Sequence, residues 1–238
     1  MCIRDRDSAD AFGYMAMAGW KTEDMLQGID GIMSLAAASN EDLATTSDIV
    51  TDALTAFGLK ASDSGHFADV LAQASANANT NVGMMGESFK YVAPVAGALK
   101  YSVEDVSLAL GLMANASVKG SMAGTSLKTS LANMAAPTDK MEAAMDKYGI
   151  SLTKRNGEMK TMHEVLDNLR SSLGGLSETE QTAAASTIFG KEAMAGMLAI
   201  INASEDDYNK LTAAVNNADG ASQQMADTML DNMNGSFT

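Results

Sequence analysis

Few residues in this sequence could carry acid–base or metal chemistry, and their spacing argues against both. The two histidines, His66 and His163, lie far apart along the chain. His163 follows Met162 at an expected helix start, where a solvated or capping role is more common than catalysis. A zinc site needs cysteine pairs or closely spaced histidines, and Cys2 is the one cysteine. We therefore predict no catalytic residue, no metal site and no cofactor.

Acidic residues form two clusters that raise the same question. Asp48 and Asp52 are four residues apart and share one face of a helix, which is usually a solvated face rather than an acid–base pair. Glu205, Asp206 and Asp207 could offer oxygen ligands to calcium, but carboxylates gather at helix N-termini for electrostatic reasons alone. The sequence has no phosphate-binding loop, dinucleotide fingerprint or GxSxG elbow. These patterns indicate a protein that is not an enzyme.

Composition favours a protein of closely packed helices. The 238 residues suit one large domain or two small ones. Aromatic residues are only 5%, while 19 methionines favour closely packed helices with adaptable apolar faces. The net charge of −14, with no basic stripe, opposes contact with nucleic acid or anionic lipid. No apolar run is long enough to span a membrane, and one cysteine excludes an internal disulfide.

The elements that position these residues are predicted to be helices throughout, giving an all-α, multi-helix array of short amphipathic helices. After Thr22, apolar residues recur with i, i+3, i+4, i+7 spacing. Ser102 and Asp105 form a capping pair, Gly58 suits a helix C-terminus, and Pro94 should kink or end its helix. Helices are expected near residues 22–36, 40–57, 62–74, 84–95, 102–113, 126–135, 138–148, 162–173, 178–188, 191–201, 205–215 and 222–233.

Two interruptions of the helices are expected. Gly120 and Gly124 should bracket a turn before the helix over residues 126–135. One small β-hairpin is expected near residues 150–160, because residues 150–153 alternate apolar and polar side chains. The Asn156-Gly157 pair that follows is the strongest short-range signal for a hairpin turn.

An internal duplication relates residues 11–59 to residues 109–150 at an offset of roughly 98 residues. Gly13 recurs as Gly111, and apolar residues replace each other at Trp20 and Val118. The match resumes after a deletion near residues 40–46. The alternative is chance similarity between two alanine- and methionine-rich stretches. The duplication divides the chain into a non-native leader (1–7), a first helical repeat unit with following helices (8–100), and a second unit with the hairpin and truncated C-terminal helices (101–238).

Three stretches carry a family resemblance: KYVAPVAG at residues 90–97, GSMAGTSLKTSLANMAAP at 120–137 and IFGKEAMAGMLAIIN at 188–202. Their order and separation resemble the core of phage tail tape measure proteins, over residues 8–238. The resemblance implies a structural virion protein in the lumen of the tail tube. Such proteins set tail length during assembly in the bacterial host cytoplasm and leave the tail at genome injection. The implied partners are the tail tube protein, tail assembly chaperones and distal tail proteins.

Two other functions stay open at this stage. One is a cytoplasmic helical scaffold or interaction module, and the other is part of a tail-associated peptidoglycan hydrolase. A fragment truncated at both ends should also expose apolar side chains and self-associate. The side chains expected to be exposed lie near the two ends of the chain: Met15, Met17, Trp20, Met225, Met229 and Met233.

Overall fold

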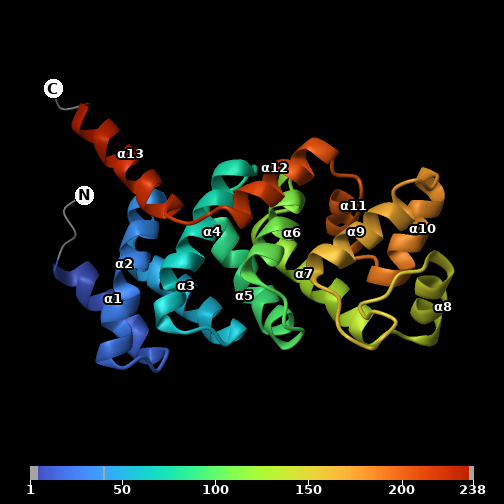
Figure 1. Cartoon of the computed structure of the whole chain (residues 1–238), viewed down its shortest axis with the longest axis horizontal. Helices are drawn as coiled ribbons and strands as arrows, with labels where there is room; N and C mark the ends of the chain where they lie inside the picture. The colour runs from blue at the N-terminus through green and yellow to red at the C-terminus, as the bar shows by residue number, and fades with distance from the viewer. Residues whose placement is uncertain (1–4, 40, 236–238) are drawn as a thin grey trace.

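The computed structural model describes residues 5–39 and 41–235, which form an elongated array of helices (Figure 1). This confirms the predicted all-α class. The described residues form thirteen α-helices and one 3-10 helix: α1 (Asp5–Met17), α2 (Thr22–Ser39), α3 (Leu43–Phe57), η1 (Ala61–Asp63), α4 (Ser64–Asn77), α5 (Val82–Ala98), α6 (Val103–Asn115), α7 (Gly120–Ala135), α8 (Asp139–Tyr148), α9 (Met162–Leu173), α10 (Glu178–Phe189), α11 (Met194–Ile201), α12 (Glu205–Asn216) and α13 (Ala221–Gly235).

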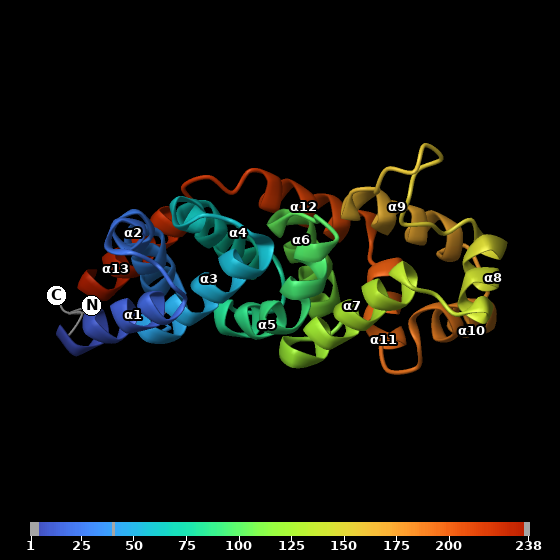
Figure 2. The same cartoon turned by 90° about the horizontal axis from the view of Figure 1, so that it is seen from below.

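The helices alternate between two layers and then return along the array. In one layer, α1, α3, α5 and α7 pack in succession, and in the other α2 packs on α4 and α4 on α6. After α8 to α11 close the far end, α12 lies over α4 and α6, and α13 lies over α2 and α4. The first and last helices therefore lie at the same end of the molecule (Figures 1 and 2).

Side-chain caps define where many helices begin. The predicted Ser102 cap is confirmed, since its hydroxyl accepts a hydrogen bond from the Asp105 N–H at 3.1 Å. Thr138 likewise accepts from the Met141 N–H. Such a cap contributes about 1 kcal/mol by pairing a backbone donor that the helix leaves free. Seven helices start this way, with the caps Asp42, Asn81, Ser102, Thr138, Thr161, Ser177 and Ser204.

Five helix ends share one hydrogen-bonded turn, and one of them confirms Gly58 as a stop. In each, an apolar residue beyond the helix donates its N–H to the carbonyl five residues earlier, which is the Schellman pattern. The residue between adopts a left-handed conformation. The donor and acceptor pairs are Trp20 and Met15, Leu59 and Leu54, Tyr101 and Ala96, Val118 and Met113, and Ile150 and Met145.

These turns bear on the proposed duplication. The alignment pairs the turn at residues 19–20 with that at 117–118, and the turn at 58–59 with that at 149–150, so helix ends correspond. The packing partners differ, however, because α1 packs along α3 whereas α8 packs mainly on α10. Superposition of the two units, and the domain division drawn from it, stay predictions. Residues 1–4 lie outside the described residues, and α1 begins at Asp5, within the segment assigned to the leader.

The turn expected between Gly120 and Gly124 is wrong. Helix α7 begins at Gly120 and runs through Gly124. A Cβ atom on Gly124 would overlap the backbone of Ser88 in α5, so this glycine allows two helices to cross closely. The Ser88 hydroxyl also donates to the Gly120 carbonyl at 2.8 Å. Helix α5 likewise continues through Pro94 to its end at Ala98.

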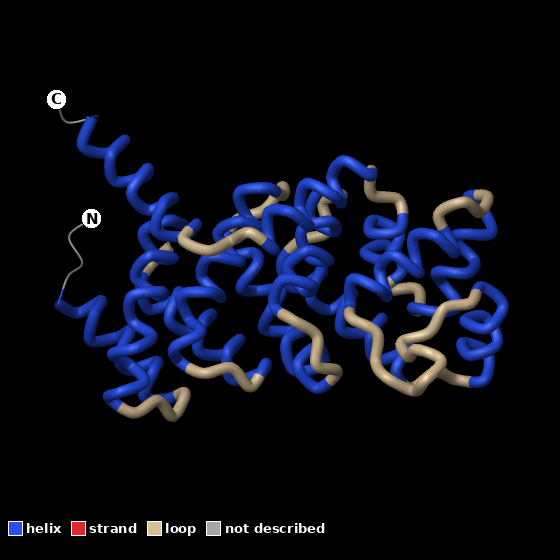
Figure 3. Tube along the Cα trace, in the orientation of Figure 1, coloured by secondary structure: helices blue, strands red, loops and turns tan. Residues whose placement is uncertain are grey.

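The β-hairpin predicted near residues 150–160 is also wrong. This segment is a loop, with no strand among the described residues and a single bridge between Thr153 and Met159 (Figure 3). Hydrogen bonds from Lys154 N to Glu158 O and from Lys160 N to Leu152 O form the tight turn that the sequence indicates. Ile150 and Leu152 pack into the helical core, and two short arms without a third strand form only a marginal ribbon, so the loop does not extend into strands.

Aromatic side chains join the two layers at the centre of the core. Phe67 of α4 and Phe89 of α5 are fully buried and lie edge to face, with ring centroids 5.5 Å apart. Phe57 of α3 packs on Phe89 in the same way at 6.0 Å. Such contacts add to the stability from burial alone.

The predicted exposure of the methionines holds in part. Met17 is 75% exposed and Met229 is 38% exposed. Met15 was expected to be exposed, but its side chain is buried in the core, so this prediction is wrong. Trp20 and Met225 are half-buried. The side chain of Met233, and Asn40 at the expected start of a helix, lie outside what the structure describes.

Candidate functional site

His66 links three parts of the array. Its Nε2 atom lies 2.5 Å from Oε1 of Glu104 in α6, and its Nδ1 atom lies 3.5 Å from Asp219, in the turn between α12 and α13. Burial lowers the pKa of His66, but hydrogen bonds and charge from Glu104 and Asp219 raise it overall. These contacts have a structural role: they join α4 to α6 and to the turn between α12 and α13.

Asp69, one helical turn from His66, caps the start of α13. Its carboxylate accepts hydrogen bonds from the Gly220 N–H at 2.7 Å and the Ser222 N–H at 2.9 Å. The Ser222 hydroxyl donates to the same carboxylate at 2.6 Å. This cap comes from a residue about 150 positions earlier in the chain and attaches α13 to α4. No local sequence pattern indicates this cap, because its partners lie far apart along the chain.

His163 lies in a polar groove of about 530 Å³ between α9 and α12. The Tyr208 hydroxyl donates to Asp167 at 2.7 Å and lies 3.2 Å from Nδ1 of His163. Arg170 stacks over the Tyr208 ring at 4.5 Å and donates to the backbone carbonyls of Ile200 and Ala203. Burial raises the pKa of Tyr208, and the bond to Asp167 raises it further. These groups satisfy one another and bind α9 to α12.

The acidic cluster at residues 205–207 forms the first turn of α12. Ser204 caps this helix, and its hydroxyl bonds the Asp207 carboxylate at 2.7 Å. Glu205 also lies 4.0 Å from Arg170. Within the described residues, no three His, Cys, Asp or Glu side chains come together in a way that could hold a metal ion. The cluster therefore interacts with the helix terminus, as its position at the N-terminus of a helix dipole favours.

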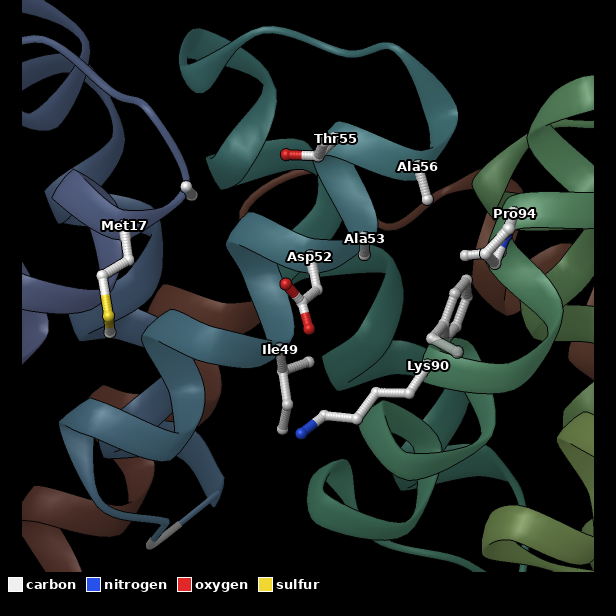
Figure 4. Close-up of a pocket in the computed structure, with 11 residues that line it drawn as sticks. Met17, Ile49, Asp52, Ala53, Thr55, Ala56, Lys90 and Pro94 are labelled. Atoms are coloured by element: carbon white, nitrogen blue, oxygen red, sulfur yellow. The ribbon is translucent and has the colours of Figure 1, made fainter.

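Asp52 and Lys90 line a second groove, which lies between α1, α3 and α5 (Figure 4), and Asp48 lies next to it. The groove encloses about 600 Å³. Lys90 of α5 bonds Asp48 at 2.7 Å, and this bond raises the pKa of Lys90. Burial raises the pKa of Asp52 and the Asp48 charge raises it further, while Lys90 opposes both. Lys90 was not predicted from the sequence as a site residue. Its i, i+3, i+7 spacing with Ala93 and Gly97, which places the three on one helix face, was a signal that could have identified it.

No described helix has both the length and the apolar character needed to cross a membrane. Residues 4–190 match the family of phage-related minor tail proteins. The chain belongs to this family. It is similar to the "Tape measure protein" of Pneumococcus phage Dp-1, with 37% identity over 228 residues, covering 96% of this chain and 20% of that protein. No solved structure matches.

A second tail-protein relative extends the same comparison. The chain is 27% identical over 234 residues to the "Probable tape measure protein" of Escherichia phage P2, covering 97% of this chain and 29% of that protein. The chain therefore spans less than a third of the length of either of these curated relatives. Both matches run through nearly all of the helical array, so the relationship applies to the array as a whole.

The three stretches that resemble tail tape measure proteins meet in space. Residues 90–97 lie in α5, residues 120–137 cover α7, and residues 188–202 run from α10 to α11. Helices α5, α10 and α11 each pack on α7. The Ser126 hydroxyl of α7 donates to the Ala193 carbonyl at 2.8 Å, and Asn133 donates to the Phe189 carbonyl at 2.8 Å. In this tail-protein family member, the three stretches thus form a packing centre of small and polar side chains.

Proposed function

We propose that this chain is a structural segment of a phage tail tape measure protein, which sets tail length during assembly and leaves the tail at genome injection. One observation carries the proposal: the 37% identity to the tape measure protein of Pneumococcus phage Dp-1, over 96% of this chain. Membership of the phage-related minor tail protein family supports the same role.

The structure is consistent with an assembly role. The stretches that carry the family resemblance serve helix packing, through contacts such as Ser126 to Ala193. The two histidines are bonded to different carboxylates in separate parts of the array, His66 to Glu104 and His163 near Asp167. We propose that this segment has no enzymatic activity of its own.

Location and partners follow from the tail role. We propose that the segment lies in the lumen of the tail tube in the virion, after assembly in the host cytoplasm. Its partners would be the tail tube protein, tail assembly chaperones and distal tail proteins, together with other copies of the same chain. The net charge of −14 supports protein partners rather than direct recognition of nucleic acid.

Purified tails test this proposal. Peptides from residues 5–235 should be found by mass spectrometry in tails from the phage or prophage that encodes the chain. An in-frame deletion of these residues should prevent tails of normal length from forming, as seen by electron microscopy. Infectious virions with normal tails, made from the deletion mutant, would contradict the proposal and favour a helical scaffold used elsewhere in the cell.

A further inference from the structure

We propose that the groove between α1, α3 and α5 is a docking site for an amphipathic helix of another protein that carries an arginine, and that this arginine pairs with Asp52. The proposal goes beyond the tail role and does not depend on it. It rests on the shape of the groove, its small-residue lining and its charge (Figure 4).

Two helical stripes shape the groove. Each stripe has i, i+3, i+4, i+7 spacing and therefore lies on one helix face. Where the stripes meet, a Cβ atom on Gly97 would overlap the Ala56 carbonyl, so the backbones of α3 and α5 cross closely there. The stripes are Ile49, Asp52, Ala53 and Ala56 on α3, and Lys90, Ala93, Pro94 and Gly97 on α5; all but Gly97 line the groove.

The lining suits an approaching helix. Ala53 and Ala93 are buried in the floor beside Phe89, and alanines allow another backbone to come close. Met17 lies on the opposite rim, is 75% exposed, and has a flexible side chain that can adapt to an apolar surface. An apolar helix face would cover Met17 and remove its side chain from water.

The charge of the groove is unbalanced. Lys90 pairs with Asp48 at 2.7 Å, and Asp52 makes no salt bridge with the described side chains. Asp52 and Lys90 line the groove, and Asp48 beside it already pairs with Lys90, so this cluster of two carboxylates and one ammonium group leaves one negative charge beside an apolar floor. A basic side chain on an occupant would neutralise Asp52 and restore the balance.

The backbone at Pro94 favours an occupant with arginine rather than lysine. Pro94 has no N–H, so the Lys90 carbonyl, four residues earlier, lacks its usual helical donor. Both residues line the groove with Asp52. A guanidinium group presents five donors in a planar fork and can reach a carboxylate and a carbonyl together.

A second copy of this chain fits the groove less well than a basic partner does. The chain carries 30 acidic and 16 basic residues, for a net charge of −14. Two copies would therefore repel each other as they approach, and more strongly at low salt. A partner segment with positive charge would be attracted instead.

A pair of synthetic helices tests the proposal on the full chain. The probe is a hydrocarbon-stapled alanine- and methionine-rich helix with one central arginine, labelled with a fluorophore, and its partner has glutamine at that position. Fluorescence anisotropy should show saturable binding of the arginine helix and weaker binding of the glutamine helix. Equal binding of the two helices, or no binding of either, would overturn the proposal.

Two variants place the binding in the groove. Thr55→Trp fills the groove from an exposed position and should abolish saturable binding. Asp52→Asn removes the charge and should weaken binding of the arginine helix about twofold to fivefold, the range for an exposed ion pair, without changing binding of the glutamine helix. The matched controls are Thr182→Trp on α10 and Asp30→Asn on α2, both exposed and outside the groove.

The remaining outcomes also decide the question. Circular dichroism melts establish that each variant is folded before binding is compared. Binding that Thr55→Trp leaves unchanged, or that Asp30→Asn weakens as much as Asp52→Asn, would show attraction to the acidic surface in general and overturn the proposal. Light scattering without peptide tests the other occupant: self-association lost in Thr55→Trp alone would assign the groove to a second copy of the chain.

Discussion

Substitution of Gly124 by alanine should destabilise the array, although alanine is the better helix former. Within a helix, replacing glycine with alanine gains about 1 kcal/mol when there is room for the methyl group. At Gly124 there is none, because the Cβ atom would overlap the Ser88 backbone of α5, which cannot rotate away as a side chain could. Overpacking of this kind costs about 1–3 kcal/mol. With the cost at the upper end, the net loss is about 2 kcal/mol.

Gly13 provides the matched control for this prediction. It lies inside α1, is exposed, and has no atom within 4 Å of the position a Cβ would take. Gly13→Ala should therefore raise stability by up to about 1 kcal/mol, while Gly124→Ala should lower the melting temperature by about 4–8 °C. Urea and thermal melts followed by circular dichroism measure both. If Gly124→Ala were as stable as the unmodified chain, the close crossing of α5 and α7 would be refuted.

Three further predictions concern the attachment of α13, the contacts of His66 and the absence of enzymatic activity. Asp69→Ala removes the cap on Gly220 and Ser222 and should cost about 1–2 kcal/mol, seen as faster hydrogen exchange in α13 but not in α8. Because the pKa of His66 is raised, its contacts with Glu104 and Asp219 stabilise the fold fully below about pH 6.5 and less as pH rises through the raised value. The stability difference between the unmodified chain and His66→Gln should therefore shrink between about pH 6 and pH 9, and a constant difference would contradict this reading. Zymography on bacterial cell walls should show no clearing, and reproducible clearing by pure protein would overturn the non-enzymatic proposal.

Local signals predicted helix limits well, because the groups that make them lie a few residues apart. Ser102 with Asp105, Thr138, and Gly58 all act within one turn of the chain. The sequence could therefore predict them without any knowledge of tertiary structure. The same holds for the tight turn around Gly157, where local hydrogen bonds formed as expected.

Features that depend on distant partners could not be predicted in this way. Gly124 looks like a turn residue in the sequence, and only its position against Ser88 explains why it lies within a helix. Asp69 gives no local sign that it caps a helix about 150 residues later. The strands expected around residues 150–160 had no third strand among the described residues to pair with, and Ile150 and Leu152 pack into the helical core instead.

The groove between α1, α3 and α5 includes one feature that the sequence could predict and others that depend on distant partners. Asp48 and Asp52 were predicted to share one helix face from their spacing, and both lie in α3, where the Asp48 charge raises the pKa of Asp52. The ion pair between Asp48 and Lys90, and the absence of such a pair for Asp52 among the described side chains, depend on how α3 crosses α5. That crossing is set by Gly97, whose small size is visible in the sequence but whose partner is not.

Tail length tests the central claim most directly. In the phage or prophage that encodes this chain, the codons for residues 5–235 would be duplicated in frame, and tails measured by electron microscopy. The tape measure account predicts longer tails, by up to ~350 Å, the length of the duplicated residues 5–235 as one continuous helix at about 1.5 Å per residue. Tails of unchanged length that contain the duplicated protein would contradict it.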